Sequence, residues 1–200
     1  MIKKYGILGS MRLLKSLLYT KLRFPQARLL RLPFDIRNRR FIVVGTGLTT
    51  GFGCRFEAFP VDDSTDKCLI IGANVEINDY VHLAAAKKIV IGNNVLIASK
   101  VFISDINHGS YSGKQSDSPS VPPNERKLSA KPIVIEDNVW IGEGVCVMAG
   151  VRIGSGSIIG ASAVVTKDIP ANSIAVGSPA RVIKVYNFDN GIWERIDISN

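Results

Sequence analysis

The stretch IEDNVWIGEGVCVMAGVRIGSGSIIGASAVV, residues 135–165, carries an aliphatic residue at every sixth position from Ile135 to Val165. A period of six matches neither the 3.6-residue turn of an α-helix nor the two-residue alternation of a simple strand. It is typical of short strands and turns wound into a solenoid, in which three units form one triangular coil of roughly 18 residues. The stretch therefore predicts an all-β-dominated fold, a parallel β-helix of hexapeptide repeats.

The repeat extends to both sides of this stretch, and its interruptions fall at one edge of the predicted coil. From the third face to the next first face the chain takes 15 residues at 56→71, 8 at 83→91 and 32 at 103→135, where an uninterrupted coil takes 6. We expect these insertions near 57–70, at 89–90 and around 109–131, and none after 135, so that the last first-face unit begins at 171. Insertions stacked at one edge indicate that function lies there.

The longest insertion, residues 109–131, is rich in Ser, Pro and Gly and predicts a loop outside the coil. His108 stands directly before it, as the last residue before the chain leaves the coil. A histidine on a rigid wall at the foot of a loop is the arrangement expected of a catalytic group. A surface histidine without function is the alternative for this residue taken alone.

The charge is concentrated at the N-terminus. Residues 1–40 hold eleven Lys or Arg and one acid, Asp35 (11 − 1 = +10), so the remaining 160 residues carry −2 of the total +8. A near-neutral body argues against nucleic acid as a partner. Basic residues interrupt every apolar run of the segment, which predicts neither a transmembrane helix nor a secretory signal and favours a cytoplasmic protein. The segment suits an amphipathic helix on the inner membrane face or, equally, a helical cap packed on the core.

Cysteine and histidine are too few or too scattered to suggest a metal site. Cys54, Cys68 and Cys146 lack ligand spacing and are expected to be small core residues. A trimeric zinc site needs three imidazoles, and each chain holds two, His82 and His108. We therefore predict no metal.

Several motifs together resemble one family. INDYVH (77–82), SDINHG (104–109) and the run from DNVWIG to SPARVIK (137–184) are similar to the hexapeptide-repeat O-acetyltransferases of the maltose, galactoside and lipopolysaccharide-modifying group, over residues 70–185. YGILGSMRLLKSLLYTK (5–21) and YNFDNGIWERI (186–196) resemble bacterial O-antigen acetyltransferases. We accordingly divide the chain into a basic amphipathic segment 1–40, a β-helix domain 41–184 with its loop, and a tail 185–200.

The resemblance implies a left-handed coil, a homotrimer, and acetyl-CoA bound between neighbouring β-helices. It also implies that His108 is the general base: a sugar hydroxyl is a poor nucleophile, and a neutral imidazole can take its proton. Asn78 and Asp79 match acceptor-binding positions or are turn residues. Asp105 either orients the imidazole, binds the acceptor, or is an ordinary turn residue, and His82, which ends a second-face unit, is an acceptor-cleft or structural residue.

The resemblance assigns the CoA site to small, aromatic and basic residues near the C-terminal end of the coil. Small residues let the pantetheine arm approach the backbone, and bases supply charge for the phosphates. The residues that match this site are Trp140, Gly142, Gly160, Ala161, Thr166, Lys167, Ser178, Pro179, Ala180 and Arg181.

The expected function is acetyl-CoA-dependent O-acetylation of a saccharide, on a lipopolysaccharide, O-antigen or other cell-envelope precursor carried on a lipid. Two alternatives remain open at this point. The acceptor is then a soluble sugar, amino sugar or serine, or the solenoid is a non-catalytic scaffold, in which case neither CoA nor His108 matters.

Overall fold

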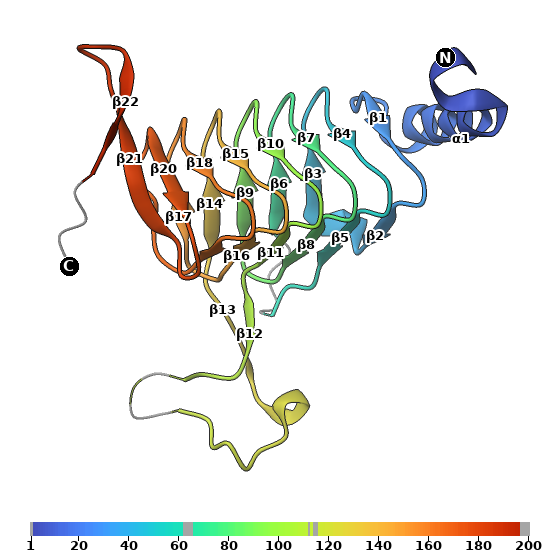
Figure 1. Ribbon diagram of the computed structural model, residues 1–200. Helices are drawn as coiled ribbons and strands as arrows, with labels where there is room; N and C mark the ends of the chain where they lie inside the picture. Colours follow the sequence, from blue (N-terminus) through green and yellow to red (C-terminus); the bar gives the residue numbers. More distant parts are fainter. Residues whose placement is uncertain (1, 62–65, 112, 114–115, 197–200) are drawn as a thin grey trace.

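The computed structural model describes residues 2–61, 66–111, 113 and 116–196. One helix, α1 (Ile2–Arg23), precedes a long coil of short strands that wind through three sheets (Figure 1). Sheet A contains, in spatial order, β1 (Leu29–Leu30), β4 (Thr49–Thr50), β7 (Glu76–Ile77), β10 (Leu96–Ile97), β15 (Trp140–Ile141), β18 (Ile158–Ile159), β20 (Ser173–Val176), β21 (Arg181–Asn187) and β22 (Ile192–Arg195).

The other two sheets complete the triangular cross-section. Sheet B contains β2 (Asp35–Arg37), β5 (Arg55–Ala58), β8 (His82–Ala85), β11 (Phe102–Ser104), β16 (Cys146–Val147) and β19 (Val164–Val165). Sheet C contains β3 (Ile42–Val44), β6 (Leu69–Ile71), β9 (Ile89–Ile91), β14 (Ile133–Ile135) and β17 (Arg152–Ile153). Two 3-10 turns are present, η1 (Arg39–Phe41) and η2 (Pro123–Glu125).

The six-residue period is explained by what lies inside the coil. The residues at the repeat positions of the deciding stretch all have no exposed surface and stack on their counterparts one coil away. They are Ile135, Ile141, Val147, Ile153, Ile159 and Val165. The strands within the coil pair in parallel, each with the strand one coil before and after it, so the backbone groups are satisfied between coils. The predicted parallel β-helix is confirmed.

The corners explain the asparagines of the repeat. Asn74, Asn94 and Asn138 occupy the turns between sheets C and A with φ angles of 54°, 55° and 60°. Asparagine tolerates this left-handed conformation better than other residues with a side chain, since its short amide can bond locally. Each coil can therefore turn tightly without a glycine at that position.

Three sequence expectations about the coil are corrected. The coil already contains β1 and β2, which pair with β4 and β5, so its strands begin within the segment 1–40. The two extra residues of the second insertion lie in 86–88 rather than at 89–90, because Ile89 and Ile91 are both buried in β9. In the last coil Ile169, not Ala171, bridges to Ile153, so that coil is two residues shorter than the period predicts.

The C-terminal strands also differ from a plain tail. β21 crosses residue 184 and pairs antiparallel with β20, and β22 pairs antiparallel with β21. The sheet thus ends in two antiparallel strands, which lie at the opposite end of the coil from α1 (Figure 1).

Helix α1 covers the first coil through hydroxyl groups. The Thr20 hydroxyl accepts a hydrogen bond from the Leu30 backbone N–H at 2.8 Å, and the Ser16 hydroxyl accepts one from the Leu32 N–H at 3.1 Å. Thr20 and Ser16 are both buried. These contacts satisfy donors on the open edge of sheet A, which has no further coil to pair with.

The Thr20 contact predicts a stability effect. Thr20→Val keeps the shape of the side chain and leaves the Leu30 N–H buried without an acceptor, so we expect the free energy of unfolding to fall by about 1–3 kcal/mol. Urea unfolding followed by circular dichroism measures it. Thr20→Ser, which keeps the hydroxyl, is the matched control, and equal losses in both variants would contradict a role for this hydrogen bond.

Candidate active site

The site begins where the chain leaves the coil after β11. Residues 106–108 form β12 (Ile106–His108), which pairs antiparallel with β13 (Leu128–Ala130), so the long insertion stands on a two-stranded arm. Figure 1 shows this arm projecting away from the coil. His108 is therefore the last residue of an arm rather than of the coil wall, which corrects the sequence expectation. It faces Leu128 in the ladder and is exposed.

The imidazole of His108 is exposed at the end of the arm. Among the residues that the structure describes it makes no hydrogen bond, whereas the backbone oxygen of His108 accepts one from the Tyr111 hydroxyl. The Tyr111 oxygen also accepts a hydrogen bond from Arg126 Nη1 at 2.9 Å. Arg126 in turn donates to the Val121 oxygen through Nε and Nη2, at 2.9 and 2.7 Å. These bonds fix the backbone around the histidine and leave its ring unoccupied.

Asp105 lies three residues before His108, and its contacts bear on the three roles considered for it. Its carboxylate accepts hydrogen bonds from the backbone N–H groups of Ala86, Lys87 and Lys88, at 2.7, 2.8 and 2.7 Å, and the residue has no exposed surface. Burial raises the pKa of the Asp105 carboxyl, and the three N–H donors oppose that rise. The geometry favours the turn role, in which Asp105 ties the foot of the arm to the 86–88 turn.

A basic cavity at the foot of the arm was missed by sequence reasoning. It measures about 240 Å³, and its lining includes Lys67, Lys87, Lys88 and Pro132. Lys87 and Lys88 are exposed. The signal in the sequence was the eight-residue passage from 83 to 91, which places both lysines in the insertion next to the arm.

His82 lies in a charged cluster on sheet B and opens the third-face strand β8, rather than ending a second-face unit. Its Nε2 is 2.8 Å from Glu57 Oε1 and 2.9 Å from Arg55 Nη2, and its ring lies 5.2 Å from that of Phe102. Glu57 also pairs with Arg37 at 3.2 Å. Because His82 already has partners on β5, the contacts favour its structural role. The sequence analysis did not predict Arg55 and Glu57 as these partners, because they lie 27 and 25 residues earlier in the chain.

Asn78 and Asp79 lie in the turn between sheets A and B, which we call the A–B edge. Asn78 is exposed, and its side chain makes no hydrogen bond to the described residues. Asp79 Oδ1 accepts a hydrogen bond from the Phe52 N–H at 2.6 Å, so that carboxylate supports the neighbouring turn. Of this pair, Asn78 is the residue with an unoccupied side chain.

The residues assigned to CoA fall into two groups. Trp140 is 49% exposed on sheet A, and Gly142, Gly160 and Ala161 stack at the A–B edge of successive coils. A Cβ at Gly142 would lie 2.6 Å from the Ala161 nitrogen, so the packing of the coils itself requires this glycine.

The remaining CoA candidates surround the last strand of sheet B. Val164 hydrogen-bonds to the backbone of Gly177 and Ala180, which brings 177–180 alongside β19. Ser178, Pro179 and Arg181 are exposed and Ala180 is buried. Thr166 and Lys167 are exposed beyond the other end of β19, in the turn from sheet B to sheet C, which we call the B–C edge.

One protomer does not bring these parts together. The arm of His108 leaves from the B–C edge, whereas Asn78, Gly142, Gly160 and Ala161 lie at the A–B edge. The strands of sheet B, two to four residues long, lie between the two edges. Figure 1 shows the arm and its loop on one side of the coil.

Two of the three cysteine thiols are buried and have raised pKa values. Burial raises the pKa of the Cys54 thiol to about 11 and also raises the pKa of the Cys68 thiol. All three cysteines are free. Cys54 and Cys68 are buried, as expected of core residues, whereas Cys146 is only half-buried. Within the described ranges, no cluster of three or more His, Cys, Asp or Glu residues is placed to hold a metal ion.

Comparisons with known proteins define the class. A family model described as "Bacterial transferase hexapeptide (six repeats)" matches residues 132–167. The fold is also that of a solved structure of AntD, an N-acyltransferase from Bacillus cereus in complex with coenzyme A and dTDP-4-amino-4,6-dideoxyglucose. That likeness has a TM-score of 0.68 with 21% identity and covers 86% of this chain and 91% of the other. These two findings place the protein in the class of hexapeptide-repeat β-helices.

Closer relatives narrow the class to a family. The chain is 42% identical over 196 residues to the "Putative lipopolysaccharide biosynthesis O-acetyl transferase WbbJ" of Escherichia coli, covering 96% of each chain. It is 34% identical over 155 residues to a galactoside O-acetyltransferase of the same organism, covering 78% of this chain and 72% of the relative. The protein belongs to the hexapeptide-repeat O-acetyltransferases and is an acyltransferase, as the sequence motifs indicated.

Proposed function

We propose that the protein transfers an acetyl group from acetyl-CoA to a hydroxyl of a sugar in a lipopolysaccharide, O-antigen or related cell-envelope precursor. The observation that carries the proposal is the exposed imidazole of His108, which makes no hydrogen bond to any described residue and stands on a backbone fixed by Tyr111 and Arg126. The likeness over nearly the whole chain to a relative named for lipopolysaccharide biosynthesis supports the acceptor class. The proposed location is the cytoplasm, where acetyl-CoA is available.

The chemistry assigns one proton transfer to His108. Its neutral imidazole takes the proton of the sugar hydroxyl while the hydroxyl oxygen attacks the thioester carbonyl carbon. The C–S bond then breaks, the ester forms, and the CoA thiolate takes the proton from the imidazolium. Asn78, whose amide is unoccupied, is placed to bind an acceptor hydroxyl, and no metal takes part in this scheme.

The active enzyme is a homotrimer of left-handed coils in this proposal. The support is that the catalytic arm and the A–B edge lie on different sides of one protomer. In a cyclic trimer the arm of one protomer reaches the A–B edge of its neighbour, and acetyl-CoA fits in the groove between them. Each site then combines His108 from one protomer with the glycine edge of the next.

The experiment that tests the function uses the full chain with acetyl-CoA and a lipid-linked oligosaccharide as acceptor, followed by mass spectrometry. Addition of one acetyl group that base treatment removes supports O-acetylation. Transfer to a soluble sugar, an amino sugar or serine instead would move the protein to the alternative acceptor class. Failure to bind CoA would favour the scaffold alternative.

The basic residues near β19 predict an effect on the donor. Lys167→Gln combined with Arg181→Gln removes charge from the expected phosphate-binding region, so we expect the KM for acetyl-CoA to rise about tenfold with little change in kcat. Steady-state release of free CoA measures both constants. Arg28→Gln, an exposed arginine near α1 that pairs with Glu76, is the control. An unchanged KM in the double variant would place the phosphates elsewhere.

A further inference from the structure

Helix α1 presents one row of apolar side chains to solvent, whereas Leu13 and Leu17 are half-buried. Ile7, Met11, Leu14, Leu18 and Leu22 follow one another at steps of four, three, four and four residues, which places them on one face of the helix. Each is at least 61% exposed. We call this face the outer stripe; Leu8, 73% exposed, borders it.

The opposite face of α1 cannot exchange places with the stripe. Ser16 and Thr20 are buried, and their hydroxyls accept hydrogen bonds from the N–H groups of Leu32 and Leu30 in the first coil. Rotating the helix to bury leucines would leave those donors without acceptors. The hydrogen bonds therefore fix the apolar face outward, which is the reverse of a helix that merely caps a core.

The charge of α1 has one sign. The helix carries Lys3, Lys4, Arg12, Lys15, Lys21 and Arg23 and no acidic residue. At about 100° per residue, Lys15 and Lys21 lie roughly 60° to either side of the centre of the stripe. An apolar stripe flanked by lysines is the pattern of helices that lie in the interface of an anionic membrane.

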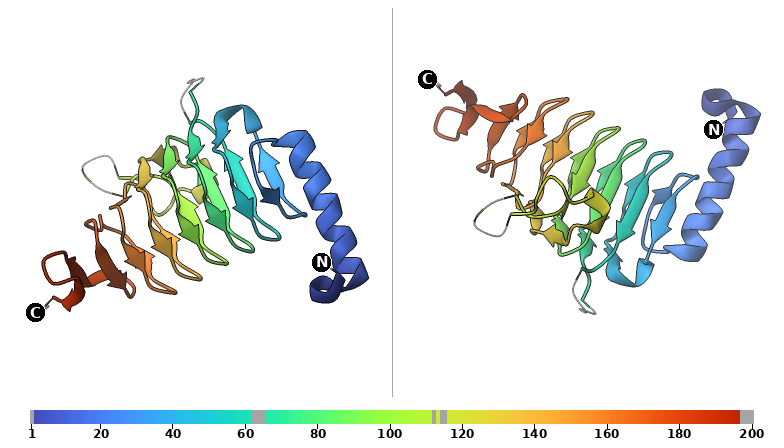
Figure 2. Two further views of the ribbon diagram at one scale, coloured as in Figure 1. Left: turned by 90° about the horizontal axis from the view of Figure 1, so that it is seen from above. Right: turned by 90° about the horizontal axis from the view of Figure 1, so that it is seen from below.

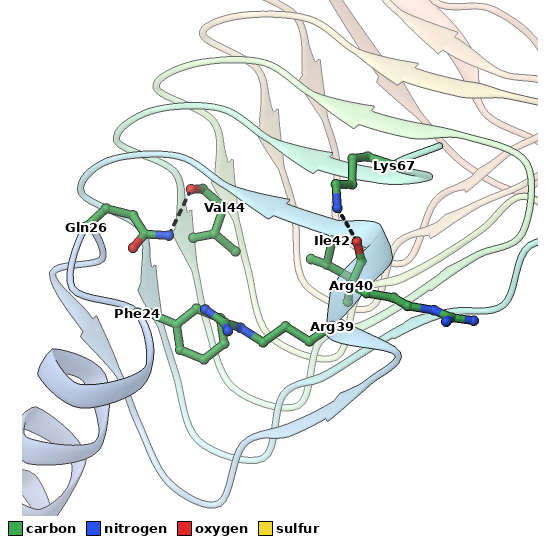
Figure 3. A pocket seen from close by; sticks show the side chains of 7 residues that line it. All are labelled: Phe24, Gln26, Arg39, Arg40, Ile42, Val44 and Lys67. Atoms are coloured by element: carbon green, nitrogen blue, oxygen red, sulfur yellow. Dashed lines mark hydrogen bonds between the residues drawn. The ribbon is translucent and has the colours of Figure 1, made fainter. Parts of the chain in front are cut away.

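More cations gather at the C-terminal end of the helix. A cavity of about 410 Å³ there is lined by Phe24, Gln26, Arg39, Arg40, Ile42, Val44 and Lys67 (Figure 3). The Arg39 guanidinium lies 4.4 Å from the centre of the Phe24 ring and donates to the Arg23 oxygen at 2.6 Å. In Figure 3 the Arg40 guanidinium extends away from the cavity. These groups extend the positive surface from the helix to the adjoining turn η1.

Either a second copy of the chain or an anionic membrane could cover the outer stripe, and the charge of α1 favours the membrane. A second copy docked end to end would bring two helices of six bases each together, and charges within about 8 Å are little screened at physiological salt. An anionic lipid surface offers both apolar depth and opposite charge. We propose that α1 docks the protein onto an anionic membrane through the outer stripe, with Lys15, Lys21 and the cations around η1 at the lipid phosphates.

This docking leaves the catalytic part of the molecule accessible. Figures 1 and 2 show α1 lying across one end of the coil, with the arm of His108 further along it. The coil then projects from the membrane, and the arm and the A–B edge stay in the aqueous phase. Membrane docking is a property separate from acetyl transfer, and the two can be measured independently.

The test uses the full chain and vesicles of equal parts phosphatidylcholine and phosphatidylglycerol, with phosphatidylcholine alone for comparison. We expect wild type to sediment with the anionic vesicles, and Leu14→Ser/Leu18→Ser to lower the partition coefficient at least about tenfold. Phe188→Ser/Ile192→Ser makes the same kind of change on exposed residues at the other end of the coil and is expected to bind as wild type does. Acetyl transfer to the lipid-linked oligosaccharide in detergent, without vesicles, should be equal in all three.

A second variant tests the charge. Lys15→Gln/Lys21→Gln is expected to bind anionic vesicles about tenfold more weakly and to show a smaller salt dependence than wild type. The proposal is overturned if wild type does not bind anionic vesicles, or if the leucine variant binds them as wild type does. It is also overturned if light scattering shows that the leucine variant forms smaller assemblies than wild type, because the stripe is then an interface between copies.

Discussion

His108→Ala is expected to lower kcat for acetyl transfer about a thousandfold, within the range that a general base contributes. The reason is that the hydroxyl proton loses its acceptor, while the backbone bonds from Tyr111 and Ser129 to His108 and Gly109 do not involve the imidazole. The KM for acetyl-CoA should change little, since the donor residues lie at other edges of the coil. Rapid-quench or steady-state release of CoA measures the loss.

Two further variants separate proton transfer from hydrogen bonding. His108→Asn keeps a polar side chain that cannot accept a proton near neutral pH, so it should lose as much activity as the alanine variant. His82→Gln alters the other histidine, whose ring contacts Glu57 and Arg55, and is expected to retain most activity. If His108→Ala stays within about threefold of wild type while His82→Gln does not, the base is His82.

Asp105→Ala is expected to lower the free energy of unfolding by about 3 kcal/mol, because three N–H donors lose a charged acceptor at once. The loss falls on the turn that carries Lys87 and Lys88 and on the foot of the arm, so activity should fall with stability. Urea unfolding by circular dichroism measures the stability. Asp105→Asn, which keeps one acceptor oxygen, should lose about half as much; equal stability of Asp105→Ala and wild type would contradict the proposed tie.

The pH dependence follows from the raised pKa of Asp105. Because burial raises this pKa, the folded protein takes up a proton at the carboxyl at a higher pH than the unfolded chain does. The free energy of unfolding of wild type, relative to that of Asp105→Asn, should therefore increase as the pH is lowered through the raised pKa. The same difference is lost when the pH is raised through that pKa. A difference that does not change with pH would mean that the carboxyl titrates alike in both states.

The sequence predicted much of the coil because the buried aliphatic residue of each six-residue unit can be recognised within that unit. An inward position in a β-helix is apolar in most coils, so Ile135, Ile141 and Val147 reveal it without knowledge of their neighbours. The edge that bears the insertions could be read in the same way, since a count of residues between units is local. The position of His108 at an insertion was likewise visible.

The side-chain contacts between coils could not be predicted from the sequence, because the lengths of the intervening loops decide which residues become neighbours. Asp105 reads as a turn residue or a catalytic one until the N–H groups of Ala86, Lys87 and Lys88 are seen around it. His82 gains Glu57 and Arg55 only through pairing of β8 with β5. The short last coil, with Ile169 in place of Ala171, likewise depends on how the chain closes its end.

The sequence by itself determined the repeat, the family motifs and the concentration of positive charge before residue 40. Only the tertiary structure decided which face of α1 packs on the first coil and which face is exposed. Ser16 and Thr20 face the first coil, where their hydroxyls accept hydrogen bonds from N–H groups that have no neighbouring strand. The apolar stripe is exposed for that reason, a consequence of hydrogen bonding at a sheet edge that no local pattern contains.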